Sequence, residues 1–165
     1  MFTEPCYGYK IKNMTDIRFY HLQRTPLSQA LPALATKALE GRYKILIRTA
    51  NKKDMMKLDK ELWTYQPESF LPHGTQDDPL PEYQPVLLAY KNTARAENSA
   101  NLLIDLDLSD QSLWQNFERC CLIFEDWNKE IKETARAAWK SLQESKEHSL
   151  SYWQQSNTKG WEQKA

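Results

Sequence analysis

Short runs of β-forming apolar residues alternate along the chain with segments whose apolar residues recur at helical spacing. The runs predict strands at residues 17–22, 43–49, 86–90, 101–106 and 120–124, with a short strand or extended piece at Phe70-Leu71. Helical spacing predicts helices that begin near Pro26, Asn51, Asp110 and Trp127, the last of them reaching at least Lys146. This alternation predicts a three-layer α/β/α fold, with a mostly parallel sheet of about five strands and helices on both faces.

The regular pattern starts at Met14 and predicts a single domain over residues 14–155. Residues 1–13 are polar and aperiodic, and are predicted to lie outside the fold as an extension, an alternative start or an expression scar. Two polar segments, residues 74–85 and 91–100, are predicted to be loops. Residues 156–165 are polar apart from one tryptophan, and are predicted to form a disordered tail.

Charge and cysteine content narrow the classes of function. The chain has 22 basic and 22 acidic residues, so no broad cationic surface for DNA is expected, and any contact with DNA is predicted to be indirect. The three cysteines, Cys6, Cys120 and Cys121, do not make a disulfide framework, which predicts a reducing compartment and hence the cytoplasm. Cys121 is expected in the core, with Cys120 as its neighbour. No apolar run of about 18 residues occurs, so no membrane contact is expected.

The order of strands and helices makes a nucleotide site the first enzyme hypothesis. In such folds the first strand-to-helix turn holds the phosphate, and here that turn reads Gln23-Arg24-Thr25-Pro26. Without a glycine, the backbone of this turn cannot approach a phosphate closely. The prediction is therefore a Rossmann-like fold without a nucleotide site or a cofactor.

A metal-dependent enzyme is the second enzyme hypothesis. Asp105 and Asp107 stand two residues apart at a predicted strand end, where two carboxylates either hold a metal ion or cap the loop. Loop capping is the favoured interpretation. The histidines at 21, 73 and 148 lack a second ligand at helical spacing, and no nucleophile has an identifiable base. We therefore expect no metal and no catalysis, and keep a nucleotide- or metal-dependent enzyme as the alternative.

The last predicted helix carries an unusual flank beside its buried stripe. At about 100° per residue, Ile131, Ala135, Ala138 and Leu142 form the apolar stripe that faces the sheet. The adjoining flank presents Lys132, Arg136, Trp139 and Gln143, with Lys140 further round. An arginine and a lysine one turn apart next to an indole suit an acidic peptide that ends in an aromatic residue. The competing interpretation is an ordinary solvated helix face.

Two further aromatic residues, Trp63 and Phe70, flank a polar turn after the second predicted helix. By default such residues pack in a core. If they stay exposed, however, they are typical anchors of a protein interface.

Several of these segments resemble the chi subunit of bacterial DNA polymerase III. The similar segments are F-Y-H-L at 19–22, Pro26-Leu27 with the following A-L-P-A-L, Leu62-Trp63 with E-S-F-L-P-H-G at 68–74, and Lys132-x-x-x-Arg136-x-x-Trp139. They occur in order and at the expected spacing between about Thr15 and Gln155. The acidic loop Glu125-Asp126-Trp127-Asn128 departs from members that offer an apolar wall there.

The resemblance implies a non-catalytic subunit that bridges two parts of the replisome. In this family, chi holds the acidic C-terminal tail of single-stranded DNA-binding protein, which ends in Pro-Phe, and it docks the psi subunit of the clamp loader. By resemblance, the tail-binding residues are Lys132, Arg136, Trp139, Lys140 and Gln143, and the psi-binding residues are Trp63 and Phe70. The chain is expected to be monomeric when alone. A direct binder of single-stranded DNA, which would stack bases on tryptophan and arginine, is a further alternative.

Overall fold

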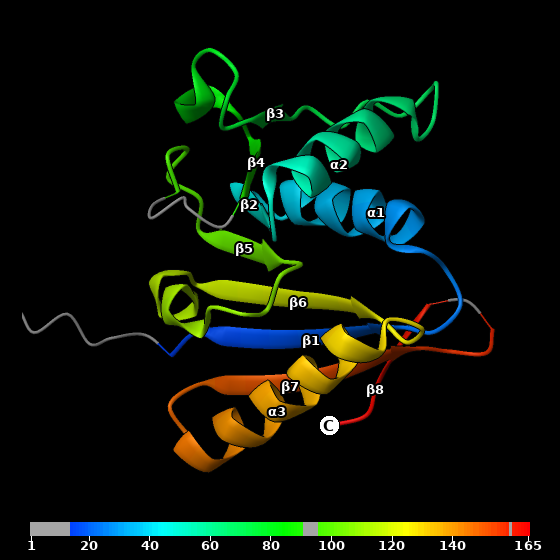
Figure 1. Cartoon of the computed structure of the whole chain (residues 1–165), viewed down its shortest axis with the longest axis vertical. Helices are drawn as coiled ribbons and strands as arrows, with labels where there is room; N and C mark the ends of the chain where they lie inside the picture. The colour runs from blue at the N-terminus through cyan, green and yellow to red at the C-terminus, as the bar shows by residue number, and fades with distance from the viewer. Residues whose placement is uncertain (1–13, 91–95, 159) are drawn as a thin grey trace, which may run out of the picture.

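A single mostly parallel sheet organises the chain. The computed structural model describes residues 14–90, 96–158 and 160–165. Within them the sheet has eight strands in the order β3-β4-β2-β5-β6-β1-β7-β8 (Figure 1). The strands are β1 (Asp16–Leu22), β2 (Ile45–Thr49), β3 (Gly74–Thr75), β4 (Val86–Tyr90), β5 (Leu102–Asp105), β6 (Arg119–Glu125), β7 (Ser149–Gln155) and β8 (Trp161–Gln163). Neighbouring strands run parallel except β7 and β8, which are antiparallel.

Three α-helices cover the two faces of the sheet. They are α1 (Leu27–Glu40), α2 (Lys52–Thr64) and α3 (Lys129–Ser145), accompanied by the short 3-10 helices η1 (Pro81–Tyr83) and η2 (Gln111–Asn116). Figure 1 shows α1 and α2 together on one face and α3 on the other. Two of the helices begin at a side-chain cap, since Asn51 accepts the N–H of Asp54 at 2.9 Å and Asn128 accepts that of Ile131 at 3.3 Å.

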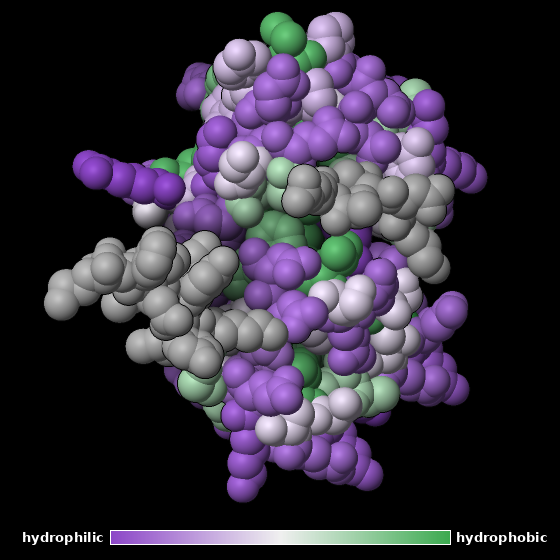
Figure 2. All heavy atoms as spheres, turned by 90° about the vertical axis from the view of Figure 1, so that its left-hand side faces the viewer, coloured by the Kyte–Doolittle hydropathy of each residue, from purple (hydrophilic) through white to green (hydrophobic). Residues whose placement is uncertain are grey.

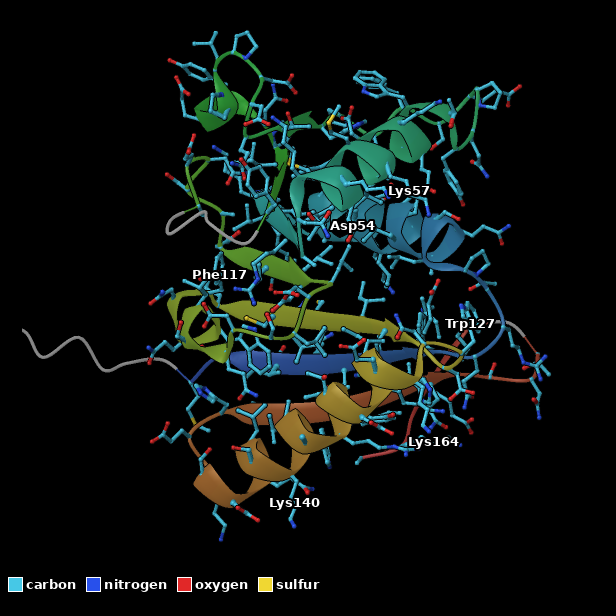
Figure 3. All side chains as sticks on the ribbon, viewed as in Figure 1. Asp54, Lys57, Phe117, Trp127, Lys140 and Lys164 are labelled. Carbon is cyan, nitrogen blue, oxygen red and sulfur yellow. The ribbon has the colours of Figure 1, made fainter. Side chains whose placement is uncertain are left out.

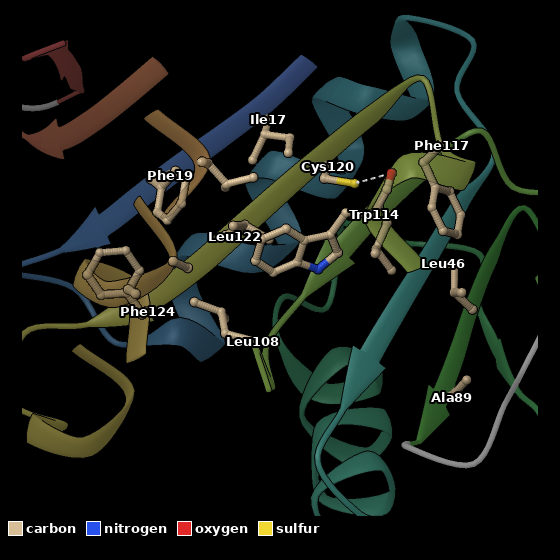
Figure 4. Packing of buried hydrophobic residues seen from close by; sticks show 14 of the residues in the cluster. Ile17, Phe19, Leu46, Ala89, Leu108, Trp114, Phe117, Cys120, Leu122 and Phe124 are labelled. Carbon is tan, nitrogen blue, oxygen red and sulfur yellow. Dashed lines mark hydrogen bonds between the residues drawn. The ribbon is translucent and has the colours of Figure 1, made fainter. Parts of the chain in front are cut away.

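Each face of the sheet buries its own apolar cluster, which is why the strands carry continuous apolar runs. On one face, Leu31 of α1 and Met55 of α2 pack against strand residues such as Ile47. On the other, Ala138 of α3 and Trp114 of η2 pack against residues such as Leu122. Figure 4 shows Trp114 in the middle of this second cluster, where its carbonyl accepts the thiol of Cys120 at 3.3 Å.

A buried ion pair lies at the carboxyl ends of the central strands. Arg48 of β2 is 2% exposed and Asp105 of β5 is fully buried, and their side chains form two hydrogen bonds, one of them 3.1 Å long between Nε and Oδ1. Asp105 also accepts the indole N–H of Trp114 at 2.7 Å and the backbone N–H groups of Asp107 and Leu108 at 3.0 and 3.2 Å. Every lone pair of this buried carboxylate therefore faces a donor.

The C-terminal segment closes one edge of the sheet. Trp161 of β8 contacts the ring of Tyr20 edge to face, with 5.0 Å between ring centroids. Beyond the strand, the N–H of Lys164 donates to the carbonyl of Tyr152 at 2.7 Å, and the N–H of Tyr152 donates to the carbonyl of Ala165 at 2.8 Å. Figure 2 shows the end of the molecule where the parallel strands begin, and hydrophilic side chains dominate the surface that is visible there.

The predicted α/β fold with a mostly parallel sheet and helices on both faces is confirmed, but the predicted count of about five strands was too low. The sequence pattern missed β7 and β8, because both strands lack a continuous apolar run. The predicted disordered tail at residues 156–165 was wrong for the described residues, which include β8.

Phe70-Leu71 forms an extended connection, which is one of the two forms predicted for it. Three smaller predictions need correction. Strand β3 lies in the predicted loop at residues 74–85. The helix expected after Asp110 is the short η2, with Phe117 after its end. The two neighbouring cysteines are reversed, since Cys120 is fully buried and Cys121 is partly exposed. Residues 1–13, and 91–95 of the second predicted loop, lie outside the described residues.

Candidate functional site

Helix α3 presents the predicted flank near the carboxyl ends of β1 and β6. Its buried stripe is Ala135, Ala138 and Leu142. Because the helix starts soon after β6 ends, its first turns lie at the edge of the sheet where parallel strands finish (Figure 1). Ligands of open α/β sheets commonly bind at this edge.

The indole of Trp139 is half-buried and held by two neighbouring rings. Its ring meets Phe19 edge to face at 5.2 Å between centroids and Tyr152 at 5.5 Å, with interplanar angles of 89° and 81°. Trp139 is therefore neither sealed in the core nor free to rotate. A ring fixed in this way can offer its remaining exposed area to a partner at little entropic cost.

A chain of polar side chains runs alongside Trp139. The Tyr152 hydroxyl lies 3.0 Å from His21 Nδ1, and His21 Nε2 lies 2.8 Å from Asp126 Oδ1. The ammonium of Lys132 donates to the same Asp126 oxygen at 3.2 Å. Because a carboxylate needs a donor, His21 carries its proton on Nε2, which leaves Nδ1 to accept the Tyr152 hydroxyl.

The charges in this network oppose each other in their effect on His21. Burial lowers the pKa of His21, the neighbouring Asp126 raises it, and Lys132 and Arg136 lower it further, so that the pKa lies below the usual value. The hydrogen bonds from Lys132 and His21 in turn lower the pKa of Asp126. At neutral pH the imidazole is therefore neutral, Asp126 is ionised, and Asp126 partly neutralises Lys132.

Arg136 differs from Lys132 in having no such neutralising partner. Its side chain is exposed, and within residues 14–90, 96–158 and 160–165 no carboxylate forms an ion pair with it. Its charge adds to the lowering of the His21 pKa that burial causes, and it offsets part of the rise that burial gives to the pKa of Tyr152. The loop before α3 adds the indole of Trp127, which is 55% exposed (Figure 3).

The structure brings together three of the five predicted tail-binding residues. Lys132, Arg136 and Trp139 lie beside one another and contact or influence the same neighbours. Lys140 and Gln143 are exposed, and in the described part of the chain no hydrogen bond, ion pair or ring contact joins them to this group. Figure 3 shows Lys140 on the outer side of α3, pointing away from the sheet.

Sequence reasoning missed His21 and Tyr152 as members of this site. Tyr152 stands in S-L-S-Y-W-Q-Q, where alternating β-formers were a signal for a strand. His21 offered no local signal, because its partners are 105 and 131 residues away along the chain. We use "α3 site" below for His21, Asp126, Lys132, Arg136, Trp139 and Tyr152.

A second candidate surface lies on α2 and the turn that follows it. Met56, Trp63 and Phe70 are 58%, 56% and 72% exposed, so the interpretation of Trp63 and Phe70 as core residues is excluded. The Trp63 ring lies 5.7 Å from that of Phe70 and 4.7 Å from that of the buried His73. We call Met56, Trp63 and Phe70 the "α2 surface". A cluster of large exposed apolar side chains is typical of a protein interface.

Comparison with known proteins identifies the family of the chain. Residues 14–149 match the model of the family described as DNA polymerase III chi subunit, HolC. The chain belongs to this family. One curated relative, "Probable DNA polymerase III subunit chi" of Rickettsia prowazekii (strain Madrid E), is 30% identical over 100 residues. That match covers 61% of this chain and 59% of the relative, so the chain matches less than two thirds of the relative's length.

Membership of the chi family fits a chain without catalytic chemistry, because chi is an accessory subunit of the polymerase holoenzyme. The carboxylates that suggested a metal-dependent enzyme have structural roles. Asp105 is committed to Arg48 and Trp114, and Asp107 accepts the hydroxyl of Ser109. Among the described residues no group of three or more His, Cys, Asp and Glu side chains could hold a metal ion.

The place where a related fold would bind a nucleotide phosphate is filled by the chain itself. The backbone N–H groups of Gln23, Arg24 and Thr25 donate to the amide oxygen of Gln155 at 3.0, 2.8 and 3.2 Å. The N–H of Leu27, at the start of α1, donates to the carboxylate of Glu125 at 2.8 Å. A phosphate at this helix terminus would have to displace a carboxylate.

The cavity next to this turn is also unsuited to a phosphate. It measures about 300 Å³ and its lining includes the carboxylates of Asp54, Glu61 and Glu125, with Lys57 as the cation. The chi-family chain therefore shares a mostly parallel sheet with nucleotide-binding folds, but its own side chains occupy the phosphate position. In the described part of the chain, no helix is long and apolar enough to cross a membrane.

Proposed function

We propose that this chi-family chain is a non-catalytic bridge within the replisome. It binds the acidic C-terminal tail of single-stranded DNA-binding protein at the α3 site, and the psi subunit of the clamp loader at the α2 surface. The observation that supports the tail proposal most is the half-buried Trp139 ring, fixed between Phe19 and Tyr152 next to the exposed Arg136. The chain contacts DNA only through these partners.

The α3 site matches the chemistry of such a tail. The guanidinium of Arg136 offers a planar fork of donors to a carboxylate, and Lys132 adds a point charge one turn away. Trp139 and the exposed Trp127 provide ring area for a terminal phenylalanine. The tail's acidic residues also interact favourably with the two cations.

The positions of the two surfaces support a bridging role. Helix α3 lies on one face of the sheet and α2 on the other, so a partner on one helix leaves the other accessible (Figure 1). Weak contacts of this kind gain strength by multiplicity, because many tails coat single-stranded DNA and the loader is itself multivalent.

The experiment that tests the tail proposal is a calorimetric titration with a short acidic peptide ending in Pro-Phe. The peptide with a free C-terminal carboxylate is expected to bind, and its amidated form to bind about tenfold more weakly, because a charge-assisted hydrogen bond is lost. Binding should also weaken with added salt. Equal affinity for the two peptides would refute recognition of the carboxylate.

Replacing Trp63 by alanine is expected to weaken binding of psi by at least about tenfold, because large aromatic side chains at an interface centre carry much of its energy. Surface plasmon resonance with immobilised psi measures the effect. Tyr83→Ala is the matched control, since Tyr83 is an aromatic residue that is even more exposed, at 73%, and lies on η1. An unchanged affinity in Trp63→Ala would exclude the α2 surface as the psi interface.

Asp126→Asn is expected to tighten binding of the tail peptide by roughly threefold, since it frees the ammonium of Lys132 from its carboxylate. The asparagine oxygen can still accept the His21 N–H, so the network keeps its geometry. Glu130→Gln, the same loss of charge at the exposed start of α3, is the control and should have a smaller effect. Weaker binding in Asp126→Asn would show that Asp126 positions Lys132 and does not compete with the peptide.

A further inference from the structure

A cavity of about 490 Å³ lies between α1 and the sheet, on the face opposite to the α3 site. Its floor includes Leu102 and Ile104, and Ala33 and Lys37 of α1 stand on one side. Among the described residues, α1 and α2 are the helices on this face, and a helix about 10 Å wide spans roughly two strands, which leaves room for the cavity. Its volume falls within the range of small-molecule sites, which is roughly 300–1,000 Å³.

The charge of this cavity is unbalanced. Its described lining contains Arg18, Lys37 and Arg119 and no carboxylate. A single oxygen of Asp16 accepts the Nε–H groups of both Arg18 and Arg119, at 3.0 and 2.9 Å. One carboxylate therefore neutralises only one of two guanidinium groups, and Lys37 adds a further positive charge to the lining. Such a group of cations, partly shielded from water, favours an anion.

The rest of the lining is aromatic. Trp153 of β7 and Trp161 of β8 lie on the same face of the sheet as α1, at the β7–β8 end. Tyr20 contacts both, stacked on Trp153 at 6.4 Å and edge-on to Trp161 at 5.0 Å between ring centroids. On the other side, the guanidinium of Arg119 lies over the Tyr43 ring, 5.0 Å from its centroid. Flat apolar walls of this kind suit a planar apolar group.

We propose that this cavity binds a small anion with a planar aromatic body, the anionic group on Arg18, Lys37 and Arg119 and the ring against Trp153 and Trp161. The two tryptophans lie beyond residue 149, where the match to the chi family model ends. Burial raises the pKa of the Cys121 thiol in this cavity to about 12, so the thiol stays protonated and the site is one of binding and not of thiol chemistry.

The test is a nuclear magnetic resonance titration of the full-length, nitrogen-15-labelled chain. The two indole N–H signals are assigned from the spectra of Trp153→Phe and Trp161→Phe, each of which lacks one of them. Phenyl phosphate and 3-phenylpropionate are the probes, and 3-phenylpropionamide is the neutral control. Both indole signals are expected to shift saturably with each anionic probe. The probe that binds more tightly shows whether the site prefers a phosphate or a carboxylate.

Variants of the lining residues test whether the anionic probes bind in this cavity. Lys37→Gln, which removes an exposed charge, should weaken binding of the probes roughly threefold, and Arg119→Gln roughly tenfold. Ala33→Phe, which places a large side chain at an exposed lining position, should abolish it. Lys140→Gln makes the same charge change on α3 and should leave it unaltered.

Three results would overturn the proposal. They are the absence of a saturable shift with both anions, equal binding of the neutral amide, and equal weakening by Lys140→Gln and Lys37→Gln. None of these bears on the tail peptide, whose binding depends on the opposite face of the sheet.

Discussion

Asp105→Ala is expected to lower the free energy of unfolding by about 3–5 kcal/mol, because it leaves a buried guanidinium without its counter-charge. Arg48 is 2% exposed, so solvent has little access to replace the lost carboxylate. The variant also removes the acceptor of the Trp114 indole and of two backbone N–H groups. Each buried donor left unsatisfied adds to the loss.

Urea unfolding followed by circular dichroism measures this effect. Asp107→Ala is the matched control, since Asp107 is a partly exposed aspartate two residues along and should cost less than about 1 kcal/mol. Combining Arg48→Met with Asp105→Leu should restore part of the lost stability, because apolar replacements remove both charges together. A change below about 1 kcal/mol in Asp105→Ala would show that Arg48 finds another partner.

Arg136→Ala is expected to weaken binding of the acidic tail peptide by roughly 10- to 100-fold, the effect of losing charge-assisted hydrogen bonds to a carboxylate. Lys132→Ala should weaken binding less, because the Lys132 ammonium is already paired with Asp126 at 3.2 Å. The expected difference between Arg136→Ala and Lys132→Ala rests on the proposed function. It arises because Lys132 is paired with a carboxylate and Arg136, on the same flank of α3, is not paired within the described residues.

Isothermal titration calorimetry of the two variants against the same peptide tests this order. Lys140→Ala is the matched control. It removes a charge from the same helix, but the Lys140 side chain points away from the sheet (Figure 3). Equal affinity of the wild-type chain and Arg136→Ala would exclude the α3 site as the tail-binding site. A larger effect of Lys132→Ala would show that the peptide displaces Asp126.

The sequence predicted the inner part of the fold well because its signals are local. Strands such as Val86–Tyr90 are buried on both faces and read as unbroken apolar runs, and Asn51 marks the start of α2 by its capping side chain. The β7–β8 edge could not be read in the same way. The residues of β7 after Ser149 are all partly exposed, and S-L-S-Y-W-Q-Q contains no continuous apolar run, so it resembles a polar segment.

The candidate site was only partly predictable for a related reason. Helical periodicity places Lys132, Arg136 and Trp139 on one flank, but it also placed Gln143 there, and it cannot show that His21 and Tyr152 meet that flank across the sheet. Periodicity likewise cannot decide whether an aromatic residue is exposed. Trp63 and Phe70 follow Leu62 and Ser69 in patterns that fit a core as well as a surface.

The hydrogen bonds that hold the chain's last residues have a practical consequence. Lys164 and Ala165 bracket the backbone of Tyr152, whose side chain touches both Trp139 and His21. Residues 164 and 165 thus hold the backbone of Tyr152, a member of the α3 site, in place. Removal of Lys164 and Ala165 would therefore disturb the ring that supports Trp139.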